Sequence, residues 1–172
     1  DARRQGQASM TVPLPGMMIL ERMIKAEEET RFLSTLSAAD WVMDDHRLRD
    51  GTAVLPGAAW PEVAAEALSA IGAKPGFTLT DLTVFRPFRL EADTPRDLRV
   101  SLTRTRDGGQ RMQARALGTA GWVLTAEAGI SLLERSAPKL DLAEIGARCP
   151  QRQSAQGGVN LPSAQEDRLA FG

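Results

Sequence analysis

The chain has 172 residues, of which 42% are apolar and 25% are charged, and its formal net charge is −1 at pH 7. This composition predicts one globular domain of ordinary size and excludes a disordered or fibrous protein. The balance of basic and acidic side chains argues against nucleic acid as the main partner, because phosphate binding needs a surplus of positive charge.

Two residue types that build common sites are nearly missing, since Cys149 is the only cysteine and His46 the only histidine. A disulfide within one chain is therefore excluded, a zinc site of Cys and His is nearly excluded, and a reducing, cytoplasmic location is expected. No apolar run approaches the roughly 18 residues of a membrane helix, and the first ten residues lack a signal-peptide pattern, so no membrane partner is expected. Because the chain does not begin with Met, we expect it to be a piece of a longer protein.

The first elements in chain order have a mixed hydrophobic pattern. Residues 1–16 are polar and punctuated by Gly and Pro, which predicts a lead-in segment before a domain that spans residues 17–135. Residues 17–37 fit either one helix or two strands joined at the acidic run Glu27 to Glu29. Two strands are the favoured interpretation.

A clear helix pattern lies between Pro56 and Gly72. Pro61 suits the first turn of a helix, and Gly72 suits its end. The other face of this helix is mostly alanine, so we predict a largely buried helix. Its apolar residues recur at helical spacing on one face: Trp60, Val63, Ala64, Ala67, Leu68 and Ile71.

After the helix, the hydrophobic period changes from 3.6 to 2. Residues 77–90 are predicted to be extended, with Pro87 at an edge or a bend. Two alternating runs flank the Asp-Gly-Gly turn at residues 107–109, which predicts a hairpin. A last alternating run predicts a strand with six apolar residues on one face: Trp122, Leu124, Ala126, Ala128, Ile130 and Leu132. The whole predicts an α+β domain in which an antiparallel sheet wraps one helix.

Residues 136–172 contain several Pro, Gly and Gln residues and are predicted to be a linker followed by the start of a second unit. Cys149 lies in this segment with no group in view that would activate it, and no role is assigned to it. The chain contains no G-x-S-x-G, G-x-G-x-x-G or P-loop pattern, so the common hydrolase, dinucleotide and nucleotide sites are not predicted.

His46 is the one side chain with the chemistry of a general base, because an unperturbed imidazole titrates at about pH 6.5. It lies a short loop before the predicted helix. The free N–H groups and partial positive charge of a helix N-terminus suit a carbonyl that gains negative charge. A base beside such donors is what removal of a proton α to a carbonyl requires. From the residues alone, a surface histidine among Asp44, Asp45, Arg47 and Arg49 is the favoured interpretation.

The motif around this histidine consists of Asp45-His46, Gly51, Pro56-Gly57 and an early helical glutamate, Glu62. It resembles the dehydratase domains of modular type I polyketide synthases and, more distantly, the hot-dog dehydratases of fatty acid synthesis. One departure is that four residues, rather than the usual three, separate His46 from Gly51. The resemblance spans roughly residues 13–134, and its flanking matches are Asp40-Trp41, the stretch from Asp81 to Phe88, Gly121-Trp122 and the closing Phe171-Gly172.

The resemblance implies the N-terminal half of a double hot-dog domain and a hydro-lyase that removes water from a β-hydroxyacyl thioester. His46 would take the α-proton, and the Gly57 N–H would hold the thioester oxygen. An aspartate of the second half would protonate the departing hydroxyl. Gly51 would permit the turn, and Pro56 would set the start of the helix. Trp60 would line the acyl tunnel, with plain core packing as its alternative.

The resemblance also implies partners. These are an acyl carrier protein whose phosphopantetheine carries the substrate, other domains of the same megasynthase, and a second copy in a homodimer. No cofactor bound by the domain itself is expected. Arg104, Arg106 and Arg111 would suit an acidic carrier protein, although a solvated strand end is the favoured interpretation. Two other functions stay open: a non-catalytic or degenerate docking or product-shaping domain, and a hot-dog thioesterase in which Asp45 or Glu62 positions water.

Overall fold

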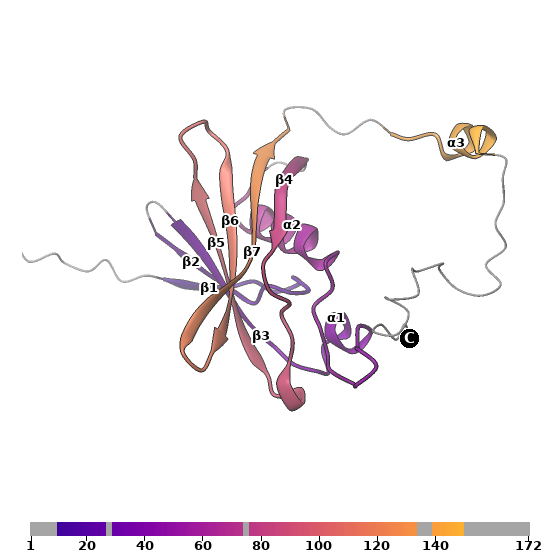
Figure 1. The fold of residues 1–172 in the computed structure, drawn as a ribbon. Helices are drawn as coiled ribbons and strands as arrows, with labels where there is room; N and C mark the ends of the chain where they lie inside the picture. Colours follow the sequence, from indigo (N-terminus) through magenta and orange to yellow (C-terminus); the bar gives the residue numbers. More distant parts are fainter. Residues whose placement is uncertain (1–9, 27–28, 74–75, 134–138, 150–172) are drawn as a thin grey trace, which may run out of the picture.

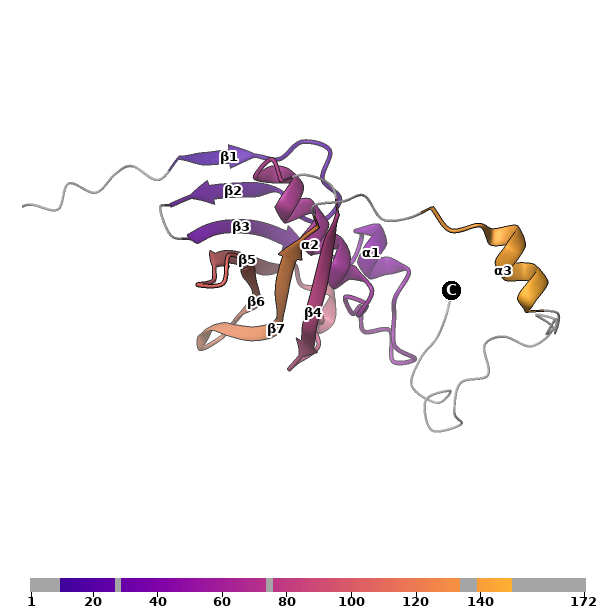
Figure 2. The ribbon, with the colours of Figure 1, turned by 90° about the horizontal axis from the view of Figure 1, so that it is seen from above.

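The structure is a computed structural model that describes residues 10–26, 29–73, 76–133 and 139–149. Within these ranges seven strands form one antiparallel sheet in the order β1-β2-β3-β5-β6-β7-β4. The sheet curves around one 12-residue helix, α2, which is the predicted hot-dog arrangement (Figure 1, Figure 2). The strands are β1 (Thr11–Pro13), β2 (Arg22–Lys25), β3 (Glu29–Leu36), β4 (Phe77–Val84), β5 (Arg96–Arg104), β6 (Gln110–Gly118) and β7 (Gly121–Leu132).

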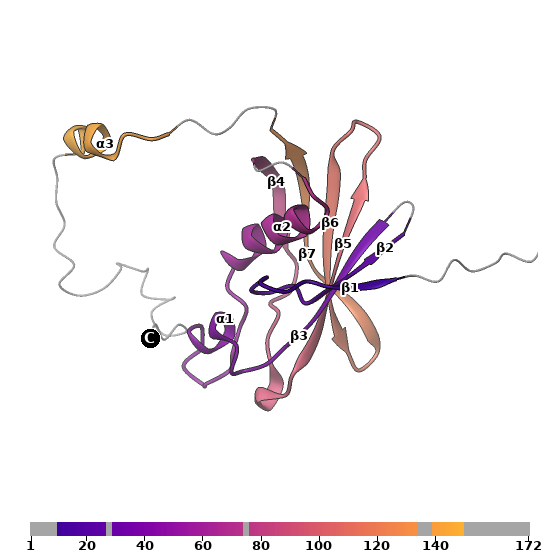
Figure 3. The ribbon, with the colours of Figure 1, turned by 180° about the vertical axis from the view of Figure 1, so that it is seen from behind.

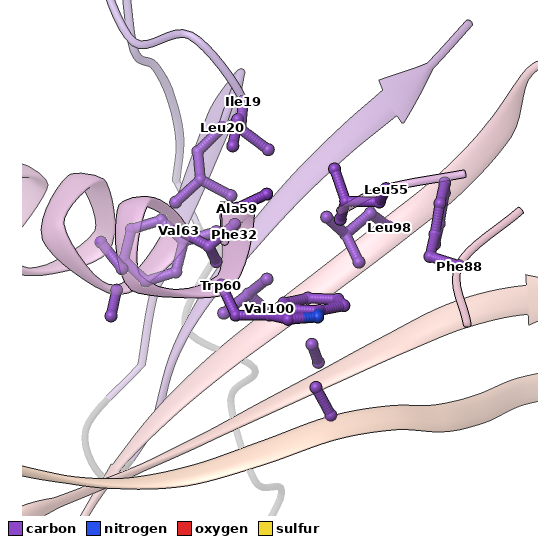
Figure 4. Packing of buried hydrophobic residues seen from close by; sticks show 14 of the residues in the cluster. Ile19, Leu20, Phe32, Leu55, Ala59, Trp60, Val63, Phe88, Leu98 and Val100 are labelled. Atoms are coloured by element: carbon purple, nitrogen blue, oxygen red, sulfur yellow. The ribbon is translucent and has the colours of Figure 1, made fainter. Parts of the chain in front are cut away.

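Helix α2 (Ala59–Ala70) occupies the predicted stretch and has the predicted end signals. Pro61 lies in its first turn, and the Gly72 N–H closes the last turn by donating to the Ser69 carbonyl at 2.9 Å. Gly72 has a φ of +75°, a conformation that favours glycine at a helix C-terminus. The apolar face of α2 packs on the concave side of the sheet, against β3 and β5 (Figure 3, Figure 4). The core therefore lies between this helix and the sheet.

Three short helical segments complete the described chain. Helix α1 (Trp41–Asp44) joins β3 to the loop before α2, and a 3₁₀ turn (Glu91–Asp93) precedes β5. Helix α3 (Leu142–Arg148) begins at Asp141, whose carboxylate accepts hydrogen bonds from two backbone N–H groups of the first turn. None of the helices in the described ranges has the length and apolar character needed to cross a membrane.

The strand predictions are mostly confirmed. Residues 17–37 hold the favoured pair of strands, β2 and β3, although residues 27–28 of the acidic run lie outside the described residues. The hairpin of β5 and β6 turns at the predicted Asp-Gly-Gly sequence, where the Thr105 N–H donates to the Gly109 carbonyl at 3.0 Å. The extended stretch after α2 ends as a strand at Val84, ahead of the predicted bend at Pro87.

The structure adds elements in both predicted flanking segments. Strand β1 lies inside the predicted lead-in, residues 1–16, and pairs with β2 through Val12 and Met23. The sheet therefore begins before residue 17. Helix α3 lies inside the predicted linker, and Cys149 at its C-terminal end is exposed. The closing Phe171-Gly172 lies outside the described residues, and the domain boundaries stay a prediction.

The predicted phase of strand β7 is wrong in its first half, because a β-bulge interrupts the alternation. Ala114 of β6 pairs with Ala126, whereas Arg115 pairs with Leu124, so Thr125 is an extra residue between them. Thr125 is buried, and its hydroxyl donates to the Ala114 carbonyl at 2.9 Å. The one-residue shift exchanges the faces of all residues before it.

The shift places Trp122 and Leu124 on the outer face of the sheet, opposite exposed or half-buried residues of β6. The guanidinium of Arg99 lies 4.5 Å from the centre of the Trp122 ring, as a cation–π contact. Burial lowers the pKa of Arg99, and the positive charges of Arg115 and Arg31 lower it further. Trp122 therefore packs against a charged side chain on the outer face of the sheet and is not part of the core.

Candidate active site

His46 lies at the base of a short β-hairpin that leads toward α2. Arg47 and Ala53 form an antiparallel bridge, and the Val54 N–H donates to the His46 carbonyl at 2.9 Å. These contacts hold the backbone of His46, while its side chain is exposed. An exposed imidazole on a held backbone is accessible to a reacting proton, as a general base must be.

The turn of this hairpin lies between Leu48 and Thr52 and consists of residues 49–51, because Arg47 already pairs with Ala53. The Gly51 N–H donates to the Leu48 carbonyl at 2.8 Å, and the Leu48 N–H donates to the Thr52 carbonyl at 2.9 Å. Gly51 has a φ of +84°, in the left-handed region that L side chains rarely adopt. A turn closed by such a glycine is a common three-residue hairpin connection. The residue in excess of the usual spacing is thus accommodated within a regular turn.

Substitution of Gly51 by alanine is expected to lower the free energy of unfolding by about 1 kcal/mol, because a Cβ is strained at this φ. Steric conflict contributes nothing, since no atom lies within 4 Å of the added Cβ. The matched control is Gly57→Ala, where the Cβ is equally free and φ lies outside the left-handed region. Urea unfolding followed by tryptophan fluorescence measures both variants, and equal losses would contradict the conformational argument.

The turn also contains Asp50, a carboxyl group whose pKa is lowered. The N–H of Thr52 donates to the Asp50 carboxylate at 2.9 Å, and hydrogen bonds from the backbone and hydroxyl of Thr52 lower the pKa of Asp50. A carboxyl with a lowered folded-state pKa stabilises the fold above its unfolded-state pKa. That contribution is lost as the pH falls through the folded-state pKa.

We therefore expect acid to loosen this turn only below about pH 4, the ordinary range of aspartate. The amide proton shift of Thr52, followed by NMR across an acid titration, reports the protonation of Asp50 directly. Its midpoint is expected below that of an unstructured aspartate, and Asp50→Asn is expected to remove the titration. A midpoint at or above the ordinary value would contradict the assigned hydrogen bonds.

The returning strand of the hairpin also pairs with the chain that follows β4. The Leu55 N–H donates to the Phe88 carbonyl at 2.9 Å, and the Leu90 N–H donates to the Ala53 carbonyl at 3.0 Å. Val54 forms an isolated bridge with Arg89 in the same pairing. Residues 53–55 thus pair with the chain that follows β4, while Ala53 and Val54 also pair with residues 46–47. This pairing places the hairpin of His46 beside the start of α2.

Pro56 and Gly57 form the first turn that leads into α2. Their carbonyls accept hydrogen bonds from the N–H groups of Ala59 at 3.0 Å and Trp60 at 3.3 Å. Gly57 is exposed, and in the described part of the chain its N–H makes no hydrogen bond to another protein group. A free N–H at the N-terminus of a helix is a donor suited to a carbonyl oxygen that gains negative charge.

Trp60 lies one turn further along, in the hydrophobic core. Its side chain is 1% exposed, and it packs among buried residues of α2, β3 and β5, such as Val63 and Val100 (Figure 4). Core packing accounts for this tryptophan. Its contact with a substrate stays a prediction.

The carboxylates considered for the alternative chemistry flank the same region. Asp45 is exposed at the C-terminal end of α1, and Glu62 is half-buried in the first turn of α2. Among the described residues, no group of three or more His, Cys, Asp or Glu side chains could hold a metal ion. Arg104, Arg106 and Arg111 are all exposed at the end of the β5–β6 hairpin, and their role in docking stays a prediction.

The sequence pattern did not predict the role of one residue of α2, Glu66. Glu66 is only 5% exposed, and its carboxylate accepts hydrogen bonds from three successive backbone N–H groups, those of Met18, Ile19 and Leu20. The bonds from Ile19 and Leu20 are 2.8 to 3.1 Å long. Glu66 thereby ties the segment before β2 to the central helix. The only signal in the sequence is a glutamate on a helix that is otherwise predicted to be buried.

Comparison with known proteins gives the family of this chain. The sequence pattern described as "Polyketide synthase dehydratase domain" matches residues 15–116, more than half of the chain. The chain belongs to the polyketide synthase dehydratase family. The matched range includes the hairpin of His46, the Pro56-Gly57 turn and all of α2. No significant match was found among curated protein sequences.

Solved dehydratase domains share the fold of this family member. The dehydratase domain from the CurF module of curacin polyketide synthase has a TM-score of 0.71 and 16% identity, over 95% of this chain and 56% of that one. A trans-AT polyketide synthase dehydratase domain from Brevibacillus brevis has a TM-score of 0.64 and 24% identity, over 76% and 51%. A CurK dehydratase variant has a TM-score of 0.71 and 16% identity, over 91% and 56%. The dehydratase chain therefore spans about half the length of these structures, as expected for an N-terminal hot-dog half.

Proposed function

We propose that this dehydratase half takes part in removing water from a β-hydroxyacyl thioester on an acyl carrier protein, which yields an α,β-unsaturated acyl chain. The observation that carries the proposal is that His46 is exposed on a hairpin whose backbone is fixed by hydrogen bonds. The chain leads from this hairpin to Gly57, whose N–H makes no hydrogen bond within the described residues. Both groups lie within the range matched by the dehydratase family. The substrate class and the carrier come from that membership.

The roles follow from the chemistry of each group. The imidazole of His46 takes the proton from the α-carbon, and the electron pair of that C–H bond forms the double bond as the β-carbon–oxygen bond breaks. The Gly57 N–H holds the thioester oxygen while negative charge develops on it. An acid of the second half, an aspartate by resemblance, protonates the departing hydroxyl so that it leaves as water. This acid–base chemistry needs no bound cofactor.

Two solved dehydratases support these roles. A CurK dehydratase in which a histidine is replaced by phenylalanine is described as an inactive mutant, and so is one in which an aspartate is replaced by asparagine. The present chain contains a single histidine. His46 is therefore the candidate base of this half, and the acid is assigned to the other half.

An uncovered surface supports the presence of a second half. Strand β4 is the last strand in the sheet order, and near its end Leu82, Val84 and Phe85 are 38%, 46% and 52% exposed. Val84 pairs with the buried Ala126, so it lies on the helix side of the sheet where α2 leaves it uncovered. In this proposal the second half covers that edge. The carrier protein, neighbouring domains, a homodimer and a cytoplasmic setting complete the proposed context.

The test joins this half to its second half and offers the protein several β-hydroxyacyl carrier-protein thioesters. Intact-protein mass spectrometry then follows the acyl chain on the carrier. Loss of one water from the carrier-bound chain is the expected result. Release of a free acid would overturn the proposal in favour of a thioesterase, in which Asp45 or Glu62 positions water. No turnover with any chain length would overturn it in favour of a non-catalytic docking domain.

A further inference from the structure

The residue that follows His46 connects three separate segments of the chain. The guanidinium of Arg47 donates to the Asp44 carboxylate from Nε at 3.1 Å and from Nη2 at 3.0 Å. Its Nη1 donates to the Gly51 carbonyl at 2.9 Å, and Nη2 also donates to the Ala38 carbonyl at 3.2 Å. Arg47 thus joins the loop after β3, the end of α1 and the turn of the hairpin.

These contacts depend on the planar shape of the guanidinium. Its Nε and Nη2 both donate to the same oxygen of Asp44, Oδ1, while Nη1 and Nη2 also donate to the carbonyls of Gly51 and Ala38. The donors of one rigid plane are thus directed at three acceptors. The side chain of Arg47 is 30% exposed and that of Asp44 is 61% exposed, so water competes with this ion pair, whereas the bond to the Ala38 carbonyl is partly buried. The restraint therefore comes from several directed bonds together and not from a strong ion pair. A lysine carries the same charge but has no planar group with several donors in fixed directions.

The hairpin needs such a restraint because it has little core of its own. Apart from Ala53 at its end, its residues from His46 to Val54 are exposed or half-buried. Four residues also separate His46 from Gly51, one more than the usual spacing. A longer connection has more conformations to lose on ordering. The bond from Arg47 to the Gly51 carbonyl restrains the turn at the position where it closes.

We infer that Arg47 is a positioning residue, which holds the hairpin so that the imidazole of His46 stays aligned with the Gly57 N–H. The inference rests on the proposed function for its catalytic meaning. Arg47 itself touches no reacting atom. Its effect on the reaction passes through the backbone of His46.

The first test uses this chain alone and measures amide hydrogen exchange by NMR. The Val54 N–H, bonded to the His46 carbonyl, reports opening of the hairpin. Arg47→Ala is expected to speed its exchange on the order of tenfold or more, with exchange in β5 and β6 unchanged. Arg47→Lys is expected to fall between, and Arg22→Ala, at an exposed arginine of β2, is expected to change nothing. Unchanged Val54 exchange in Arg47→Ala overturns the inference.

A second readout follows the imidazole itself. Because the chain has one histidine, its ring protons give a single set of NMR signals. These signals are expected to shift and broaden in Arg47→Ala and to be recovered in part by Arg47→Lys. If Arg47→Ala fails to fold, as shown by circular dichroism, the Arg47→Lys comparison carries the test. Signals of Arg47→Lys identical to the wild type would then overturn the inference.

The third readout links the restraint to the reaction, in the dehydratase that contains both halves. Arg47→Ala is expected to lower kcat by about tenfold to a hundredfold with little change in KM, as misplacement of a catalytic group does. Faster Val54 exchange with an unchanged kcat overturns the positioning role. A wild-type protein that does not dehydrate any substrate overturns the proposed function instead, and the exchange result on Arg47 still stands.

Discussion

Replacement of His46 by alanine is expected to lower kcat/KM for dehydration by about 10²- to 10⁴-fold, the usual contribution of a general base. The chain contains no second imidazole to take over the proton. Stability is expected to change little, because the side chain is exposed and the hairpin contacts of residue 46 come from its backbone. The measurement is steady-state turnover of a β-hydroxyacyl carrier-protein thioester by the protein with both halves, with thermal unfolding measured in parallel.

The matched control for this substitution is Asp45→Asn, which changes the adjacent exposed side chain and leaves the imidazole in place. It is expected to retain dehydration within a few-fold. Dehydration that survives in His46→Ala would remove His46 as the base. Loss of activity in Asp45→Asn together with retention in His46→Ala would transfer the chemistry to the carboxylate.

The second large effect is expected at Glu66. Glu66→Ala is expected to lower the free energy of unfolding by about 3 kcal/mol, because buried backbone donors that lose their acceptor each cost about 1–3 kcal/mol. Ile19 and Leu20, which supply two of these donors, are 2% and 1% exposed. Met18 is 54% exposed and contributes less, since water can replace the lost acceptor. Urea unfolding followed by tryptophan fluorescence measures the loss.

Two further variants separate the hydrogen bonds from a general effect of removing charge. Glu66→Gln keeps one acceptor oxygen but turns an NH₂ group toward backbone donors, so an intermediate loss is expected. Glu62→Ala removes a half-buried glutamate from the first turn of the same helix and is expected to cost less than about 0.5 kcal/mol. Equal losses at positions 62 and 66 would contradict the assigned role of the Glu66 carboxylate.

The local features of this domain were predictable because their signals are local. The spacing from Trp60 to Ile71 predicts α2, since a helix brings residues three and four apart onto one face. The Asp-Gly-Gly sequence predicts the β5–β6 hairpin for a similar reason, because its backbone conformation suits the turn. The motif from His46 to Gly57 likewise lies within one short stretch, and the structure confirms that this stretch leads directly into α2.

The phase of β7 was not predictable from its own residues. Apolar side chains occupy every second position from Trp122 to Leu132, and this pattern predicts one buried face, but the apolar Val123 between Trp122 and Leu124 fits the opposite phase equally well. The bulge at Thr125 arises from the pairing of β7 with β6, where the extra residue gives its hydroxyl a buried acceptor. A one-residue shift of register cannot be recognised in a period-2 pattern when the side chains on both faces are similar.

The α+β class, the central helix, most of the strands and the position of His46 just before that helix could be predicted from the sequence alone. These follow from periodicity and turn chemistry, which act between near neighbours in the chain. The partners of Arg47 and Glu66, in contrast, are set by the packing of the whole domain. The N–H donors of Glu66 lie 46 to 48 residues away along the chain, and one acceptor of Arg47 lies on a segment before α1. Such bonds depend on how the sheet and helices meet in space, and no local pattern encodes that geometry.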